Sequence, residues 1–267
     1  MELMVTLTRM KSELQPEKEL SCPQEQVALP IIYEDNHIIV VIKPQNVPCC
    51  PDESQDADLL TLIKEHIKTT EEKKGEAFCG LVHRLDRVTG GVMIYAKTSK
   101  AAARLGEQIK NGGFEKKYLA VVVGEPKQRE QTLVHHLLKR ESKNVVEVVP
   151  PATLGAKRAE LVYKITKTLS KGGQVVSLVE VKLVTGRSHQ IRVQMAAIGC
   201  PVFGDAKYGG DKLGKGWSIA LWAHELVFTH PVNGDTMRFV VNPPETVPWT
   251  SFEFDRKPRK SGGGVTE

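Results

Sequence analysis

The chain has 267 residues, of which 40% are hydrophobic and 26% are charged, a composition typical of a globular protein with a sizeable core. Its formal net charge is +5, and no apolar run is long enough to span a bilayer. The five cysteines include no Cys-x-x-Cys pair and give neither a disulfide framework nor a zinc site. We therefore expect a cytoplasmic protein that holds no metal.

The first 28 residues are polar, contain Pro16 and Pro23 and show no periodicity, which predicts a peripheral or poorly ordered leader. Two apolar runs, residues 31–33 and 38–42, predict a hairpin-like pair of strands. Leucine and isoleucine at helical spacing predict a helix over residues 59–67.

The most distinctive stretch, residues 80–98, places the charged sequence HRLDR between two apolar, β-branched runs. If residues 82–86 are extended, Leu85 points into the core while Arg84 and Asp86 share the opposite face. The glycines that follow at 90 and 91 allow a tight turn or a close approach of a ligand. The alternative for this stretch is an exposed turn held by ion pairs.

The next segments predict a helix and a series of strands. Thr98 or Ser99 can cap a helix over residues 100–110. In the predicted strand 114–123, Tyr118 and Ala120 face one way and Leu119 the other. Residues 145–149, 159–166 and 175–184 also predict strands, while the pattern of residues 133–140 leaves their structure open.

A second helix is predicted between Ser188, as its cap, and Gly199, as its stop, with His189 and Arg192 three positions apart on one face. Strands follow over residues 219–228 and 237–241, and residues 251–267 predict a basic, disordered tail. Together these elements predict one α+β domain over residues 29–250, dominated by antiparallel strands.

Several common chemistries are excluded because their motifs are missing, including the phosphate-binding G-x-x-x-x-G-K-[ST], the dinucleotide-binding G-x-G-x-x-G and the zinc-binding H-E-x-x-H. What remains is Asp86, Tyr118 and Arg192, three reactive or charged groups on separate segments. Each of the last two taken alone also fits an ordinary strand or surface-helix residue. A basic strip lies nearby and comprises Lys97, Lys100, Arg104, Lys110, Lys116 and Lys117.

The sequence HRLDRVTGG, residues 83–91, resembles the H-R-L-D-x-x-T-S-G motif of the RluA-type pseudouridine synthases. Residues 116–124, KKYLAVVVG, resemble that family's K-x-Y-x-A-x-V-x-G, and residues 185–209 resemble its G-R-x-H-Q-I-R and G-D-x-x-Y-G block. Two positions depart from the pattern: Gly90 replaces a serine, and Gln194 replaces a histidine.

The resemblance implies a pseudouridine synthase fold, α+β, with a mixed but mainly antiparallel sheet, flanking helices and a central cleft. It implies that uridines of ribosomal or transfer RNA are isomerised without a cofactor. Asp86 would be the essential carboxylate, acting through a covalent adduct or a glycal. Arg192 would pair with Asp86, and Tyr118 would lie over the uracil and help to remove the carbon-5 proton.

The resemblance also implies that the target base leaves the RNA stack and that Arg84 enters the vacated space. Leu85 and Ile191 would be apolar walls, His189 and Gln190 would complete the substrate-binding set, and the basic strip would follow phosphates. We expect a monomer whose choice of target lies within the catalytic domain. Two alternatives are a catalytically silent RNA-binding or RNA-folding protein and an aspartate-dependent nucleoside glycosidase.

Overall fold

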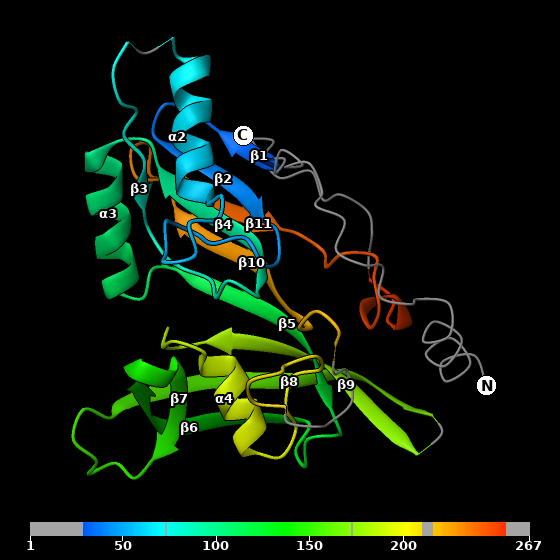
Figure 1. Cartoon of the computed structure of the whole chain (residues 1–267). Coiled ribbons are helices and arrows are strands. Elements are labelled where there is room, and N and C mark those ends of the chain that lie inside the picture. The colour runs from blue at the N-terminus through cyan, green and yellow to red at the C-terminus, as the bar shows by residue number, and fades with distance from the viewer. Residues whose placement is uncertain (1–28, 73, 172, 210–215, 255–267) are drawn as a thin grey trace, which may run out of the picture.

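The computed structural model describes residues 29–72, 74–171, 173–209 and 216–254 (Figure 1). The predicted leader and residues 255–267 of the predicted tail lie outside the described residues. Within them, eleven strands form one sheet, in which β3 (Gly80–Leu81) pairs with β4 and β11 (Thr236–Val240) pairs with β10. The other nine follow the order β1 (Ile31–Glu34), β2 (Ile38–Lys43), β4 (Gly90–Ala96), β10 (Leu221–Thr229), β5 (Glu115–Val123), β9 (Gln174–Leu183), β8 (Lys157–Lys171), β6 (Glu130–Arg140) and β7 (Val145–Val149).

The sheet is mixed but mainly antiparallel, because the only parallel pair among the described strands joins β4 to β10. This confirms the predicted α+β class. The hairpin predicted near the start is the antiparallel pair of β1 and β2. The stretch whose structure the sequence leaves open, residues 133–140, forms most of β6.

Three α-helices lie against this sheet in the described residues: α2 (Leu59–Thr70), α3 (Ser99–Lys110) and α4 (Gln190–Ala197). The Thr98 side chain accepts a hydrogen bond from the Ala101 amide and caps α3, as predicted. The predicted cap of α4 is wrong. Ser188 is not the cap, since the helix begins after His189, whose side chain makes no capping hydrogen bond.

Alternating side chains on the strands build a separate hydrophobic core on each face of the sheet. Tyr118 and Ala120 face the core that includes apolar residues of α2 and α4. Leu119 faces the other core, which includes Leu105 of α3. In Figure 1, α2 and α3 lie beside the β1–β4 end of the sheet, and α4 lies beside β6–β8.

The packed body continues beyond residue 250, where the sequence predicts the tail to begin. A 3₁₀ helix, η2 (Trp249–Ser251), crosses that boundary, and a second one, η1 (Glu141–Lys143), precedes β7. Phe252 is only 2% exposed and belongs to the same core as Leu119. Residues 251–254 are therefore part of the folded domain.

Candidate active site

Asp86 lies in the irregular segment between β3 and β4, which the last residue of β2 helps to hold in place. Leu85 is 7% exposed and anchors this segment in the core, as the alternation predicts. The ammonium of Lys43 donates hydrogen bonds to the backbone carbonyls of Arg87 and Thr89, both at 2.8 Å. The Asp86 side chain remains 25% exposed. Leu85 and Lys43 thus fix the segment, while the Asp86 carboxylate stays accessible to solvent.

Arg192 of α4 contacts Asp86 and is also hydrogen-bonded to a second carboxylate, that of Asp205. Its Nη1 lies 3.3 Å from Oδ2 of Asp86. Its Nε and Nη2 each donate to the Asp205 carboxylate at 2.8 Å, and the Asp205 side chain is fully buried. Burial opposes the charge, but the hydrogen bonds from Arg192 to Asp205 and Asp86 raise its pKa. The guanidinium is therefore a fixed cation that orients Asp86.

His189 stands beside this ion pair, at the start of α4. Its φ of 52° lies in the left-handed region, which non-glycine residues seldom adopt. This conformation places Nε2 at 4.0 Å from Oδ2 of Asp86, while Nδ1 lies 2.7 Å from the Tyr208 hydroxyl. Burial lowers the pKa of His189, and the Asp86 charge opposes that effect only in part.

Tyr118, Leu85 and Ile191 line the same core next to the carboxylate. All three are more than nine-tenths buried and belong to one hydrophobic cluster. Burial raises the pKa of Tyr118, and the negative charge of Asp86 raises it further. Its phenol therefore stays protonated at neutral pH in the absence of substrate.

The two remaining predicted site residues lie differently. Arg84 is exposed, as required of a side chain that meets solvent or a ligand. Gln190 is 3% exposed and its amide is used within the protein. Its Oε1 accepts hydrogen bonds from the Thr185 hydroxyl and the Arg187 amide, and its Nε2 donates to the Glu160 carbonyl. Gln190 thus braces the turn before α4.

Both departures from the family pattern have a physical account in the packing. A Cβ on Gly90 would lie 2.3 Å from the ring of Trp222, so this ring occupies the space that a serine needs. Gln194 is fully buried, and its Nε2 lies 3.2 Å from the Leu133 carbonyl and 3.0 Å from Nδ1 of His135. Neither position touches the Asp86 carboxylate.

Sequence reasoning missed three residues that hold the site: Lys43, Asp205 and Tyr208. Lys43 ends a strand, where a lysine ordinarily points to solvent. Asp205 follows Arg192 by thirteen residues across a loop, so no helical or strand spacing links them. Asp205 and Tyr208 do fall within the G-D-x-x-Y-G block, which was the available signal.

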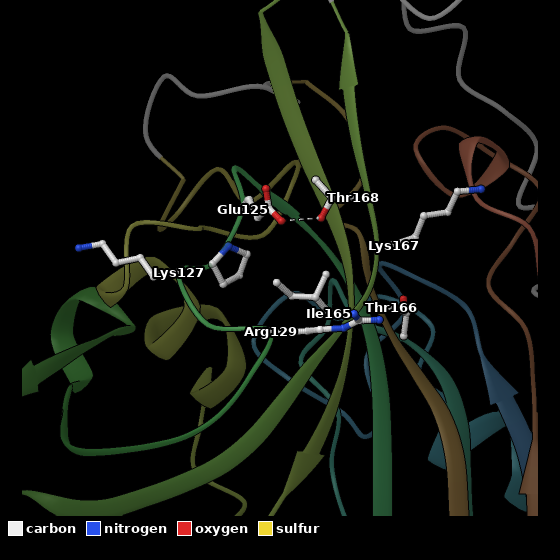
Figure 2. A pocket seen from close by; sticks show the side chains of 8 residues that line it. Glu125, Lys127, Arg129, Ile165, Thr166, Lys167 and Thr168 are labelled. Atoms are coloured by element: carbon white, nitrogen blue, oxygen red, sulfur yellow. Dashed lines mark hydrogen bonds between the residues drawn. The ribbon is translucent and has the colours of Figure 1, made fainter.

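A separate hollow of about 350 Å³ lies between the loop after β5 and an irregular part of β8 (Figure 2). None of the sequence-predicted site residues lines it. Figure 2 shows Lys127 and Lys167 pointing in opposite directions, while the Thr168 hydroxyl donates to Glu125. The charged side chains that line this hollow therefore do not point toward a common centre. This hollow is not the central cleft that the resemblance implies, which stays a prediction.

In the described residues, no cluster of three or more histidine, cysteine, aspartate or glutamate side chains could hold a metal ion. No helix in that part of the chain has both the length and the apolar character needed to cross a membrane.

Comparisons with known proteins agree on one family. The family model described as RNA pseudouridylate synthase matches residues 37–197. The chain is 34% identical over 227 residues to a Bacillus subtilis protein named uncharacterized RNA pseudouridine synthase YjbO, covering 84% of this chain and 76% of that protein. It is 33% identical over 233 residues to the ribosomal large subunit pseudouridine synthase D of Zymomonas mobilis, covering 84% and 71%.

A solved structure, human RNA pseudouridylate synthase domain containing 4, shares the fold. Its TM-score is 0.67 at 23% identity, and the match covers 80% of this chain and 88% of that one. The family model and the relatives at 33–34% identity confirm the resemblance inferred from the motifs.

Proposed function

The chain belongs to the RNA pseudouridylate synthase family and is an isomerase of RNA, and we propose that it uses Asp86 to convert specific uridines to pseudouridine. The target class that we propose is ribosomal or transfer RNA. Ribosomal RNA is the first to test, because one relative is named a ribosomal large subunit pseudouridine synthase.

The observation that carries the proposal is the pairing of the accessible Asp86 carboxylate with Arg192 at 3.3 Å. The reaction breaks the bond between N1 of uracil and C1′ of ribose, turns the base and joins C5 to C1′. An anionic carboxylate can add to the sugar or base and leave again, or remove a sugar proton to give a glycal. Arg192 would favour the anionic, correctly oriented form in either route.

Tyr118 and Arg84 would act on the target base in the proposed mechanism. Tyr118 would contact the uracil through its ring and take part in removing the C5 proton once the base is rejoined. A base in folded RNA must first leave the stack, at a cost of a few kcal/mol. Arg84 is exposed and would stack in the vacated space, because a planar guanidinium can replace a base there.

The test is tritium release from RNA labelled at C5 of uridine, with the wild type compared with Asp86→Asn. We expect the variant to bind RNA with nearly unchanged affinity and to release no tritium. Asp235→Asn is the matched control, since Asp235 is an exposed turn residue whose loss should leave the rate unchanged.

Full activity of Asp86→Asn would show that the proposed mechanism is wrong. RNA binding by the wild type without tritium release from ribosomal or transfer RNA would favour a catalytically silent RNA-binding protein.

We also propose that the protein works in the cytoplasm as a monomer and without a metal ion. Activity should persist in the presence of a chelator, and the active species should elute at the size of one chain. Loss of activity on chelation that added metal restores would contradict the metal-free proposal.

A further inference from the structure

Tyr208 lies behind two of the groups that face Asp86, and the proposed mechanism gives it no role. Its backbone amide donates to Oδ1 of Asp205 at 3.1 Å, which fixes the residue to the carboxylate that holds Arg192. The Arg192 guanidinium lies 5.1 Å from the centre of the Tyr208 ring. The Tyr208 hydroxyl lies 2.7 Å from Nδ1 of His189. One side chain therefore supports both neighbours of Asp86.

The hydrogen bonds around the Tyr208 hydroxyl favour one of the two positions for the ring proton of His189. The Val146 backbone N–H donates to the Tyr208 oxygen at 2.9 Å. The hydroxyl's own proton is then available for Nδ1, an arrangement in which Nδ1 is the acceptor. The proton of a neutral His189 is consequently on Nε2, the nitrogen 4.0 Å from Asp86. In the opposite tautomer the hydroxyl oxygen would accept from two donors, and its own proton would need a different acceptor.

Burial and the neighbouring charges together favour the neutral forms of Tyr208 and His189. Burial raises the pKa of Tyr208, which keeps the hydroxyl protonated. Burial lowers the pKa of His189; the charges of Asp86 and Asp205 oppose this, and those of Arg192 and Lys207 support it. The left-handed backbone of His189 costs free energy, so the ring is held at Asp86 by the contacts around it.

We infer that Tyr208 is a positioning residue that fixes His189 as the Nε2–H tautomer, so that His189 presents a hydrogen-bond donor beside Asp86. His189 is then a donor to an oxygen of the bound nucleotide and not a general base. The tautomer assignment stands independently of the reaction, whereas the recipient of the hydrogen bond rests on the proposed function.

The tautomer is measured directly by long-range ¹H–¹⁵N NMR of the histidine rings in the full-length, substrate-free protein, with His189→Gln used to assign the signals. We expect the wild type to carry the proton on Nε2 at neutral pH. In Tyr208→Phe, Nδ1 loses its donor, and we expect a mixture of the two tautomers. Tyr163→Phe is the matched control, because it removes a buried hydroxyl that donates elsewhere, to the Gln128 carbonyl.

The kinetic readout is tritium release at saturating RNA. Tyr208→Phe should lower kcat by roughly three- to tenfold, the factor that one ordinary hydrogen bond is worth, with little change in KM. Tyr163→Phe should leave kcat unchanged, and thermal unfolding of both variants shows whether the fold is retained. His189→Gln should retain more activity than His189→Leu, because the amide can still donate near the position of Nε2.

A proton on Nδ1 of wild-type His189 would overturn the inference, and so would an unchanged Nε2–H tautomer in Tyr208→Phe. If the tautomers behave as expected but no RNA releases tritium, the positioning role of Tyr208 stands and the proposed function fails.

Discussion

Lys43 is a buried cation that is solvated by backbone carbonyls. It is 0% exposed, and its Nζ donates to the carbonyls of Pro44, Arg87 and Thr89 at 2.8–2.9 Å. The described residues place no carboxylate within ion-pair distance of it. Two of the three carbonyls belong to the segment that follows Asp86. The lysine therefore connects the end of β2 to the segment that carries Asp86.

This burial predicts an unusual pH dependence of stability. Burial lowers the pKa of Lys43 from 10.5 to about 8. Between these two values the unfolded chain binds a proton that the folded chain does not. The free energy of unfolding of the wild type should therefore rise with pH relative to Lys43→Met, by up to about 3 kcal/mol. Below about pH 8 both states are protonated, so the difference should be constant.

Urea unfolding of both proteins from about pH 7 to pH 10 measures this difference, with the exposed Lys74→Met as the control. Parallel pH profiles of the wild type and Lys43→Met would show that Lys43 titrates normally. At every pH, Lys43→Met should also lower the rate of tritium release, because the segment carrying Asp86 loses its anchor.

The sequence was sufficient to find the groups that would do chemistry but not those that hold them. Asp86, Tyr118 and Arg192 each lie within a recognisable motif. In the structure, Nη1 of Arg192 lies 3.3 Å from Oδ2 of Asp86. Asp205 and Tyr208 act through contacts across loops, and these depend on how α4 lies against the sheet. Periodicity describes single elements, so contacts between elements escape it.

At the scale of elements, α4 shows where local signals mislead. Ser188 is a favourable N-cap residue, but Gln190 holds the preceding turn through Thr185 and Arg187. The observed cap is His189, one residue after the expected one, and it has a left-handed conformation. The contacts of Gln190 therefore outweigh the capping preference of Ser188. As a result, Nε2 of His189 lies 4.0 Å from Asp86. By contrast, the cap of α3 follows its local sequence.

The parallel contact between β4 and β10 depends on Gly91. Its φ is +125°, and a Cβ there would lie 2.2 Å from the Ala223 carbonyl oxygen. Gly91→Ala should therefore lower the free energy of unfolding by about 3 kcal/mol or more, because backbone cannot move aside as a flexible side chain can. Denaturant unfolding measures the loss.

Gly106 provides the opposite control within α3. A Cβ there meets nothing within 4 Å, and the residue is helical. Gly106→Ala should raise the free energy of unfolding by about 0.5–1 kcal/mol, since alanine favours the helix. Equal effects of the two alanine substitutions would contradict the role assigned to the close approach at Gly91.

At the scale of the whole molecule, β5 joins the two ends of the sheet, because it pairs with β10 on one side and β9 on the other. The helices α2 and α4, which lie at different ends, contribute to one core on one face. Asp86 precedes β4, Tyr118 lies on β5 and Arg192 lies on α4. The candidate site thus requires β4, β5 and α4 to be assembled, and no single local segment contains it.

The basic strip predicted from the sequence divides into buried and exposed charges in the folded molecule. The Lys97 side chain is 6% exposed and forms ion pairs with Glu34 at 2.6 Å and Glu71 at 2.7 Å. Lys100, on the first turn of α3, is exposed. A phosphate contact releases counterions from RNA only if the cation can reach it, so Lys100 is available for this role and Lys97 is not.

We therefore expect Lys100→Gln to reduce the slope of log affinity against log salt by about 0.7–0.9 if the strip follows RNA phosphates. Lys97→Gln should leave that slope unchanged and instead lower the free energy of unfolding by about 1–3 kcal/mol, because the ion pairs of Lys97 with Glu34 and Glu71 are lost. RNA binding at four salt concentrations and urea unfolding of both variants measure the two effects. An unchanged slope in Lys100→Gln would remove this part of the strip from the RNA surface, and an equal loss in both variants would mean that the Lys97 ion pairs open when RNA binds.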